Sequence, residues 1–259
     1  MSYPSSTSIV VENATKAFTL RYHRTFKEVS VAKMRGQQIS DTFKALDDVS
    51  FTVEQGESIG LMGLNGSGKS TLLKLVNGIM KPDSGKVLTR GRIAGLIATG
   101  AGFHPQLTGR ENVFLNAAVF GMGERETNRK LDEIIDFANI GKHLDSPVGN
   151  YSSGMYARLG FAVAINVDCD IFLADEALAV GDKPFKRKCL EKMEEVRDSG
   201  TTVFYVSHAA GSVRRMCDRV LVLEDGRLGF DGGVDEGIKY VKYDSDDEDK
   251  DDDELGADI

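Results

Sequence analysis

Apolar and polar positions along this chain alternate with two different periods, and each change of period marks the expected start or end of an element. Runs with strand character lie at residues 8–11, 43–53, 57–62, 86–97, 170–175, 201–206 and 219–229. Two of these runs, 86–97 and 219–229, turn in their middle, so each is interpreted as a pair of strands. The pattern therefore predicts strands along the whole folded length of the chain.

Segments with helical spacing separate these strands. They lie at residues 70–79, 110–140, 152–166 and 185–198. One face of the first helix would carry Leu72, Leu73, Val76 and Ile79. Because strands alternate with helices, the predicted fold class is α/β, with a largely parallel sheet that is covered by helices on both faces.

A polar stretch from about residue 20 to 41 fits neither period, and we interpret it as an insertion with some helical content. Residues 21–44 carry six basic and two acidic side chains, a net charge of +4. We expect this segment to lie near a membrane or a membrane partner, where anionic headgroups would favour its charge. A solvated surface loop is the alternative.

The charge of the chain is segregated along its length. Of the net charge of −8, the segment 244–259 carries −9, from ten acidic residues and one lysine, so residues 1–243 sum to +1. An acidic segment of this kind cannot bury apolar surface, so 244–259 is expected to be a disordered tail and 1–243 the folded domain. A nearly neutral domain has no broad basic face, which argues against nucleic acid as a partner.

Composition excludes several other classes of protein. The 259 residues are 41% hydrophobic, enough for a substantial core. The three cysteines are too few and too scattered for a disulfide framework or a zinc site. The N-terminus shows no signal-peptide pattern, and no apolar run approaches the roughly 20 residues of a membrane helix. We therefore expect a protein that is neither secreted nor membrane-spanning, but that can be a subunit of a membrane complex.

The expected strand at 57–62 is followed by a match to the phosphate-binding pattern G-x-x-x-x-G-K-[ST]. The eight residues are Gly63, Leu64, Asn65, Gly66, Ser67, Gly68, Lys69 and Ser70. Glycines let successive backbone N–H groups point at phosphate oxygens, and the next helix presents the positive end of its dipole there. Lys69 can reach the β- and γ-phosphates, Ser70 can ligate Mg²⁺, and Thr71 can contact the α-phosphate.

Two later strands deliver further reactive side chains. The strand 170–175 ends at Asp175 and Glu176, and the strand 201–206 is followed by His208. Asp175 can ligate the metal, directly or through a water, and Glu176 can orient or deprotonate an attacking water. Because ligands of open α/β sheets gather at the carboxyl ends of the strands, we expect His208 to be catalytic and not merely structural.

The Ala-rich helix expected at 152–166 opens with Tyr-Ser-Ser-Gly-Met at 151–155. Ser152 or Ser153 can cap this helix, and its first N–H groups form an anion site. Taken alone, this segment is an ordinary helix start.

In order and approximate spacing, the phosphate loop, the two carboxylates and His208 resemble the nucleotide-binding subunits of ATP-binding cassette (ABC) transporters. Segment 151–155 lies where that family has its signature motif, commonly Leu-Ser-Gly-Gly-Gln, and departs from it at three of five positions. Its form is similar to that of the branch that exports lipid-linked polysaccharides such as O-antigen, capsule and teichoic acid. Segments 102–112 and 176–182 also resemble this branch, and the resemblance covers residues 8–242.

The resemblance implies a P-loop NTPase cassette fold: a parallel core sheet, a small antiparallel β subdomain, and a helical subdomain at about 103–168. It implies ATP as the substrate, Mg²⁺ as the cofactor, and Lys69, Glu176 and His208 as the catalytic residues. The adenine-stacking aromatic would be Phe18, with Tyr22 as the second choice.

Two copies of the chain are expected to pair head to tail. Ser153 and Gly154 would lie on the helical subdomain, where they cannot easily reach the phosphates on their own Lys69. In the family's paired arrangement they cap the γ-phosphate that the other copy holds, so closing and opening of the pair would move two permease subunits.

The implied function is ATP-driven export of a lipid-linked glycan by a subunit bound peripherally at the cytoplasmic face of the cell (inner) membrane. An importer or drug-exporter cassette, a soluble cassette ATPase acting on ribosomes or DNA, and a non-catalytic cassette are the alternatives. The relay glutamine of the family is not assigned, because Thr99 occupies its position and Gln106 is displaced. The sequence names neither the glycan nor a role for the acidic tail.

Overall fold

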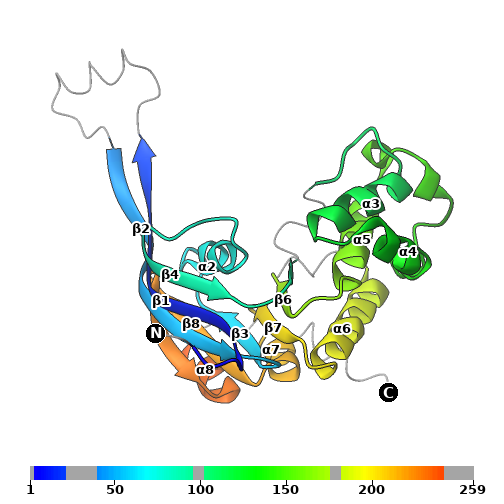
Figure 1. Cartoon of the computed structure of the whole chain (residues 1–259). Coiled ribbons are helices and arrows are strands. Elements are labelled where there is room, and N and C mark those ends of the chain that lie inside the picture. Colours follow the sequence, from blue (N-terminus) through cyan, green and yellow to red (C-terminus); the bar gives the residue numbers. More distant parts are fainter. Residues whose placement is uncertain (1–2, 22–39, 96–101, 176–181, 242–259) are drawn as a thin grey trace, which may run out of the picture.

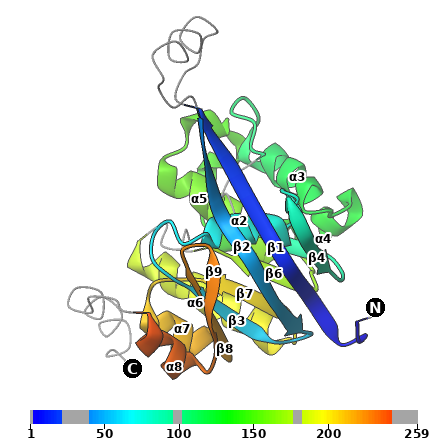
Figure 2. The ribbon, with the colours of Figure 1, turned by 90° about the vertical axis from the view of Figure 1, so that its left-hand side faces the viewer.

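The computed structural model describes residues 3–21, 40–95, 102–175 and 182–241. The strands are β1 (Thr7–Arg21), β2 (Ser40–Glu54), β3 (Ser58–Met62), β4 (Ser84–Thr89), β5 (Ile93–Gly95), β6 (Ile171–Ala174), β7 (Thr202–Val206), β8 (Arg219–Glu224) and β9 (Arg227–Gly232). They form a small antiparallel sheet of order β2-β1-β4 and a larger sheet of order β5-β6-β7-β3-β8-β9 (Figures 1 and 2).

The larger sheet is parallel from β5 to β8, and β9 joins it antiparallel through a hairpin with β8. Every residue of β3, β6 and β7 is buried. Strands covered on both faces read as continuous apolar runs, which is why these three lacked alternation in the sequence. The α/β prediction is confirmed, as is the small antiparallel sheet built from the N-terminal strands.

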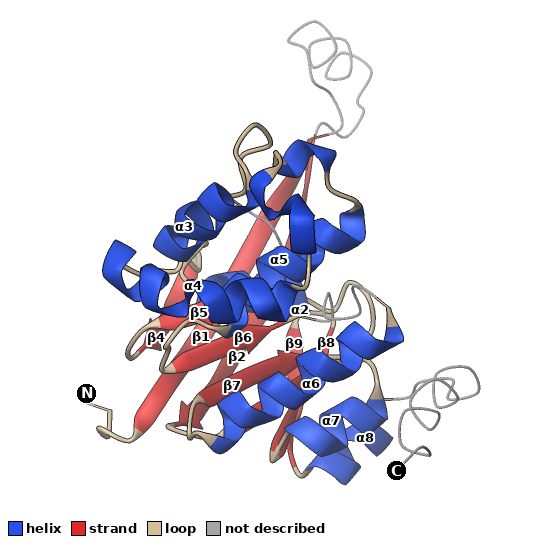
Figure 3. Ribbon diagram, turned by 90° about the vertical axis from the view of Figure 1, so that its right-hand side faces the viewer, coloured by secondary structure: helices blue, strands red, loops and turns tan. Residues whose placement is uncertain are grey.

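Helices cover both faces of the larger sheet. They are α2 (Lys69–Val76), α3 (Gly109–Val119), α4 (Glu124–Ala138), α5 (Ser153–Ile165), α6 (Lys183–Asp198), α7 (Ala210–Met216) and α8 (Val234–Tyr240), with two short 3₁₀ turns at Gly141–Asp145 and Val148–Asn150. Leu72 and Leu73 of α2 belong to a core cluster that joins both sheets. Helices α6, α7 and α8 lie on the opposite face of the larger sheet, in front of the strands in Figure 3. The phosphate loop therefore leads into a helix, α2, that packs against both sheets.

Helices α3, α4 and α5 form a unit to one side of the sheets, within the range expected for a helical subdomain (Figure 1). Thr108 and Glu111 close a capping box at the start of α3. From Leu159 to Ile165 every residue of α5 is buried. A helix that is apolar on all sides is buried on all sides, which explains its Ala-rich sequence.

Strands β1 and β2 continue as a two-stranded ribbon beyond the small sheet (Figures 1 and 2). The pairing of β1 with β4 ends at Thr15, whereas its pairing with β2 runs on to Arg21 opposite Ser40. The expected insertion at 20–41 therefore starts later and ends earlier than predicted. Its remainder, 22–39, lies outside the described residues.

Three further expectations need correction. The helix predicted for 70–79 ends at Val76, because Gly78 adopts a positive φ of 73° and closes its C-terminus. Ile79 is 60% exposed and does not share the buried face of α2. The helical pattern at 110–140 is two helices, interrupted between Val119 and Glu124. Helices α7 and α8 were not predicted.

The two strands predicted for 86–97 exist, but β4 and β5 belong to different sheets. Among the helices of the described residues, none has the length and apolar character needed to cross a membrane.

Candidate functional site

The candidate residues meet because three parallel strands end at one edge of the larger sheet. Strand β7 lies between β6 and β3, with Ala174 opposite Tyr205 and Leu61 opposite Val206. The residues that follow these strands are therefore neighbours: Asp175 after β6, His208 after β7, and the phosphate loop after β3. The structure brings together side chains that are more than a hundred residues apart in the sequence.

Two glycines of the phosphate loop are fixed by close backbone contacts as well as by their dihedral angles. Gly63 has φ of 139°, and a Cβ at this position would meet the Leu223 carbonyl oxygen at 2.3 Å. Gly68 has φ of 108°, and its Cβ would meet the Ala45 carbonyl oxygen at 2.4 Å. A side chain at either position would displace backbone, so the loop keeps this path only with glycine there.

Lys69 is folded back into the loop. It is 8% exposed, and its Nζ donates to the carbonyl oxygens of Gly63 at 2.6 Å and Leu64 at 3.0 Å. Both acceptors are backbone atoms of the loop itself. The ammonium group is therefore already held at the place where a bound anion would sit.

The buried hydroxyl of Ser67 indicates that the phosphate loop binds a ligand. The residue is 5% exposed, and its Oγ has no hydrogen-bond partner among the described residues. A buried hydroxyl without a partner costs about 1–3 kcal/mol, so such groups are rare in folded proteins. This hydroxyl fits an acceptor supplied by a ligand.

The first turn of α2 is arranged for an anion. Gly68 is its N-cap residue, has no side chain to cap it, and is followed by Lys69, Ser70 and Thr71 with no acidic residue in the turn. The N–H groups at a helix start and the helix dipole favour negative charge at this end. Glycine geometry, ammonium group, orphan hydroxyl and helix terminus together fit the polyphosphate of a nucleotide.

The remaining candidates of this edge differ in what can be described. Ser70 is exposed and Thr71 half-buried on α2, while Asp175 and His208 are both partly exposed. Glu176 lies outside the described residues. Ser70 and Asp175 each offer an oxygen ligand of the kind Mg²⁺ prefers.

The segment 151–155 leads into α5 of the helical unit, which lies to one side of the sheets (Figure 1). Of the two serines expected to cap α5, Ser152 does so: its Oγ accepts from the Met155 N–H at 3.2 Å. Ser153 is exposed, and a Cβ at the half-buried Gly154 would meet only the Ser152 Oγ, at 3.9 Å. The start of α5 is therefore accessible from outside.

The expected adenine-binding and relay residues are placed only in part. Phe18 is half-buried on β1, opposite Phe43 of β2, with the Lys16 Nζ 5.9 Å from its ring centre. Tyr22 and Thr99 lie outside the described residues. Gln106 is exposed in the loop before α3.

One polar residue of this region was not given a role from sequence. Asn112 of α3 is fully buried; its amide donates to the carbonyl oxygens of His104, Leu107 and Thr108 and its Oδ1 accepts from the His104 N–H. It fixes the loop at 104–108. Sequence could have flagged it only as an asparagine on the apolar side of the expected helix.

A hollow of about 810 Å³ adjoins the phosphate loop. Its walls are Gly63–Ser67, the end of β8 at Val222–Asp225, and the end of α8 at Lys239–Val241. Tyr240 donates to Glu224 Oε2 at 3.2 Å across this wall. The last described residues of the chain therefore lie beside the loop.

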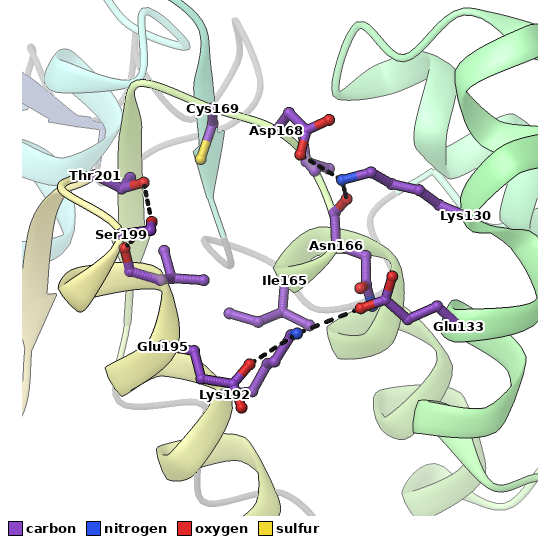
Figure 4. A pocket seen from close by; sticks show the side chains of 12 residues that line it. Lys130, Glu133, Ile165, Asn166, Asp168, Cys169, Lys192, Glu195, Ser199 and Thr201 are labelled. Carbon is purple, nitrogen blue, oxygen red and sulfur yellow. Dashed lines mark hydrogen bonds and ion pairs between the residues drawn. The ribbon is translucent and has the colours of Figure 1, made fainter.

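A second hollow, of about 340 Å³, lies at the opposite edge of the sheet, where β6 and β7 begin (Figure 4). Lys130 of α4 bonds Asp168 and the Asn166 carbonyl, and Lys192 of α6 bonds Glu133 and Glu195 (Figure 4). All five charged side chains that line it are thus paired. Of these ion pairs, Lys192–Glu133 connects α6 with α4 of the helical unit.

Comparison with known proteins gives a family and close relatives. The model of the ABC transporter family matches residues 46–179. The chain is 42% identical over 234 residues to the O-antigen export system ATP-binding protein RfbB of Klebsiella pneumoniae, which covers 89% of this chain and 95% of that protein. It is 38% identical over 239 residues to the teichoic acids export ATP-binding protein TagH of Staphylococcus haemolyticus, covering 92% and 89%.

Another relative is longer. ABC transporter protein AbcA of Aeromonas salmonicida is 50% identical over 190 residues, which is 73% of this chain but only 62% of that protein. Among solved structures, an ATP-binding subunit of an ABC transporter superposes with a TM-score of 0.70 at 25% identity, covering 89% of this chain and 91% of the other. A dimeric post-hydrolysis cassette bound to ADP and Pi gives 0.68 at 22% identity, covering 87% and 98%, and shares the fold.

Proposed function

Because this chain belongs to the ABC transporter family, we propose that it is the ATP-hydrolysing subunit of an exporter of a lipid-linked polysaccharide. The observation that carries the proposal is the 42% identity to an O-antigen export ATP-binding protein, which extends over 95% of that relative. The similarity to a teichoic acid export protein supports the same branch. Glycans carried by both kinds of exporter are bulky and polar, so moving them across a membrane requires energy.

The nucleotide is held by the phosphate loop in this proposal. The N–H groups of Gly66, Gly68 and the first turn of α2 donate to the β-phosphate, and the Ser67 hydroxyl gains its missing acceptor. The Lys69 ammonium group exchanges its two carbonyl acceptors for phosphate oxygens. The new hydrogen bonds are stronger, because donor and acceptor are then both charged. Residues Gly63 and Asn65 shape the loop, Thr71 contacts the α-phosphate, and Phe18 stacks on the adenine.

Hydrolysis uses the groups at the ends of β6 and β7. Ser70 and Asp175 would hold Mg²⁺, which neutralises charge on the phosphate oxygens when it is bound. Glu176 accepts the proton of the attacking water, and His208, next along the sheet edge, stabilises the γ-phosphate and the water between them. The side-chain chemistry and the meeting of the three strand ends support these roles.

Two copies act together in this proposal. The accessible start of α5, with Ser153 and Gly154, provides N–H donors for a phosphate. Because this helix start belongs to the helical unit, its donors would not reach a phosphate that the loop of the same copy holds. Head-to-tail pairing would place them over the γ-phosphate of the other copy. ATP then joins the two copies, and its hydrolysis releases them.

The pair would drive two copies of a membrane-spanning permease from the cytoplasmic face of the membrane. A peripheral subunit of this kind needs no spanning helix of its own. The basic segment 21–44, with its charge of +4, would lie on the membrane side and face anionic headgroups or the pyrophosphate of the lipid carrier.

The proposal is tested with the full complex in lipid vesicles. The chain is co-expressed with its candidate permease, purified, and assayed for ATP hydrolysis with and without lipid-linked O-antigen, capsule and teichoic acid precursors. We expect one class of glycan to stimulate turnover several-fold, and the complex carrying Glu176→Gln to show no stimulation. Stimulation by small solutes in place of glycans would indicate an importer or drug exporter. Failure to bind any permease would indicate a soluble ATPase.

A further inference from the structure

The turn between β8 and β9 is buried at its tip. Glu224 pairs with Arg227, so the turn itself consists of Asp225 and Gly226, whose φ values of 47° and 80° are both positive. Asp-Gly with two positive φ values is a favoured two-residue hairpin turn. Tips of connecting segments ordinarily lie on the surface, yet Gly226 is buried. The tip therefore makes contact with another part of the fold.

The contact is with the phosphate loop and with β2. The Gly226 N–H donates to the Ser67 carbonyl oxygen of the loop at 3.1 Å, and the Gly226 carbonyl oxygen accepts from the Asp47 N–H of β2 at 2.8 Å. A Cβ on Gly226 would meet the Ala45 carbonyl oxygen at 2.9 Å, the same oxygen that excludes a side chain at Gly68. The hairpin turn, β2 and the loop thus meet backbone to backbone, and only glycine fits at this contact.

The hydrogen bond to Ser67 fixes the direction of the next amide in the loop. The Ser67–Gly68 peptide bond is trans, so its C=O and its N–H point in opposite directions. Because the Ser67 carbonyl faces the hairpin turn, the Gly68 N–H points away from it. Gly68 is the N-cap residue of α2, and in the proposed function its N–H donates to the β-phosphate.

Ion pairs beside the turn contribute less than these backbone contacts. Arg227 donates to Asp47 Oδ2 from Nε at 3.1 Å and from Nη2 at 2.6 Å, and Lys44 Nζ donates to Asp47 Oδ1 at 2.9 Å. The Arg227 side chain is 72% exposed, and exposed ion pairs are weakened by water and salt. The direction of the loop amide therefore depends on the Gly226 backbone and not on these side chains.

We propose that Gly226 is a positioning residue for the nucleotide: its N–H holds the Ser67 carbonyl and thereby aims the Gly68 N–H at the β-phosphate. The inference rests on the proposed nucleotide site and adds to it a determinant of phosphate binding on a distant hairpin. A donor that is already oriented needs no rearrangement when the anion binds. Without the Gly226 contact the Ser67–Gly68 peptide can rotate, and the hydrogen bond to the phosphate is lost.

Gly226→Ala tests the contact in the full-length protein, with Gly200→Ala as its matched control. Gly200 has a φ of 88°, and a Cβ there would meet no other described atom within 4 Å. Both variants therefore carry the strain of alanine at positive φ, but only Gly226→Ala adds a collision. Isothermal titration measures the affinity for ADP, which contains the β-phosphate. In protein labelled with ¹⁵N-glycine, NMR follows the Gly68 amide proton at saturating ADP.

We expect Gly226→Ala to bind ADP roughly 10–100-fold more weakly than the native protein, the effect of one hydrogen bond to a charged group, and Gly200→Ala to stay within about threefold. ADP should move the Gly68 amide proton downfield in the native protein and in Gly200→Ala, and less in Gly226→Ala. Weaker binding with the shift at its native size would mean a merely structural role and would overturn the proposal. An equal loss of affinity in both variants would also overturn it.

An amide-to-ester change separates the N–H from the collision, and decides the question if Gly226→Ala does not fold. Glycolic acid in place of Gly226 removes only the N–H; the segment from Cys217 onward is synthesised, ligated to residues 1–216, and the full chain is refolded. The same ester at Gly237, whose N–H donates to the Gly233 carbonyl oxygen in α8 at 2.9 Å, is the control. Only the ester at Gly226 should weaken ADP binding. Native affinity of that ester contradicts the proposal, whereas failure of the native protein to bind ADP means that the proposed nucleotide site itself is wrong.

Discussion

The two edges of the larger sheet carry hollows of similar kind but opposite chemistry. At the edge where β6 and β7 begin, five charged side chains line a hollow of about 340 Å³, and each of them has a partner of opposite charge. At the edge where β3, β6 and β7 end, the loop holds a buried hydroxyl without a partner among the described residues and a helix start without a cap.

The difference shows how a binding site can be distinguished from a structural contact between two parts of the fold, here called the seam between α6 and the helical unit. The ion pair Lys192–Glu133 joins α6 to the helical unit, and each of its charges is neutralised by the other. In the phosphate loop, by contrast, the buried Ser67 hydroxyl has no partner among the described residues, at a cost that a bound acceptor would offset. The two hollows thus differ in the state of their donors and acceptors as well as in volume.

The largest effect that this contrast predicts is that of Lys69→Ala. The variant loses the buried ammonium that the loop carbonyls hold, and we expect nucleotide binding and ATP hydrolysis to fall by more than about 100-fold, with the unfolding transition retained. Isothermal titration with the nucleotide checks the binding. Lys192→Ala, at the opposite edge, is the matched control. Affinity within twofold of the native protein would contradict the role of Lys69.

Glu176→Gln should slow turnover without weakening nucleotide binding. The amide keeps the shape of the carboxyl group but accepts a proton poorly, so hydrolysis should fall by about 10²–10⁴-fold. Repulsion of the γ-phosphate also falls, and a dimer should accumulate with ATP and Mg²⁺, as measured by size-exclusion chromatography with light scattering. A monomer with normal turnover would show that Glu176 is not the base.

Cys169 lines the hollow of about 340 Å³, and its thiol should react only slowly with alkylating reagents. Burial raises the pKa of its thiol to about 11, so less thiolate is present at neutral pH than for a free cysteine. Alkylation at about pH 7.5 should be slower than that of a free thiol by roughly 300-fold. The rate should rise about tenfold per pH unit toward pH 10, because each unit raises the thiolate fraction tenfold below the pKa. Peptide mapping after iodoacetamide treatment measures both, and a rate close to that of a free thiol would show that this hollow opens.

The smallest expected effect is that of Lys192→Ala on the seam. Its ion pairs with Glu133 and Glu195 are partly exposed, and such pairs contribute at most about 1 kcal/mol. Denaturant unfolding should therefore report a loss of that size or less, with an unchanged nucleotide affinity. A large loss of affinity would mean that the seam, too, serves the nucleotide.

Local patterns made the loop predictable. The eight residues at 63–70 are contiguous and each has its own chemical reason, so the strand, loop and helix around them could be foreseen. The neighbourhood of Asp175 and His208 was also foreseeable, because both follow apolar strands of one parallel sheet. The insertion of β3 between β7 and β8 was not, since sheet order depends on contacts between distant segments.

Other features depend on tertiary contacts that no local pattern encodes. The close approach of Gly68 to Ala45 and the burial of Ser67 need the small sheet and β8 in place. Asn112 is polar in sequence but fully buried, because the loop that it bonds folds over it. The end of α2 at Val76 follows from the positive φ of Gly78, whereas the apolar spacing continues to Ile79.

The ribbon of β1 and β2 has a mechanical consequence. The Asp83 carboxylate holds β1 at the point where the ribbon leaves the small sheet. It accepts hydrogen bonds from the Ala17 N–H at 2.7 Å and from Lys16 Nζ at 2.7 Å. These two contacts lower the pKa of Asp83, so they persist when the surroundings turn mildly acidic. From Ala17 to Arg21 the strand extends about 14 Å. A tilt of about 10° at Asp83 would carry the backbone of Arg21 through about 2 Å, so a small rotation at the base of the ribbon becomes a displacement of its end.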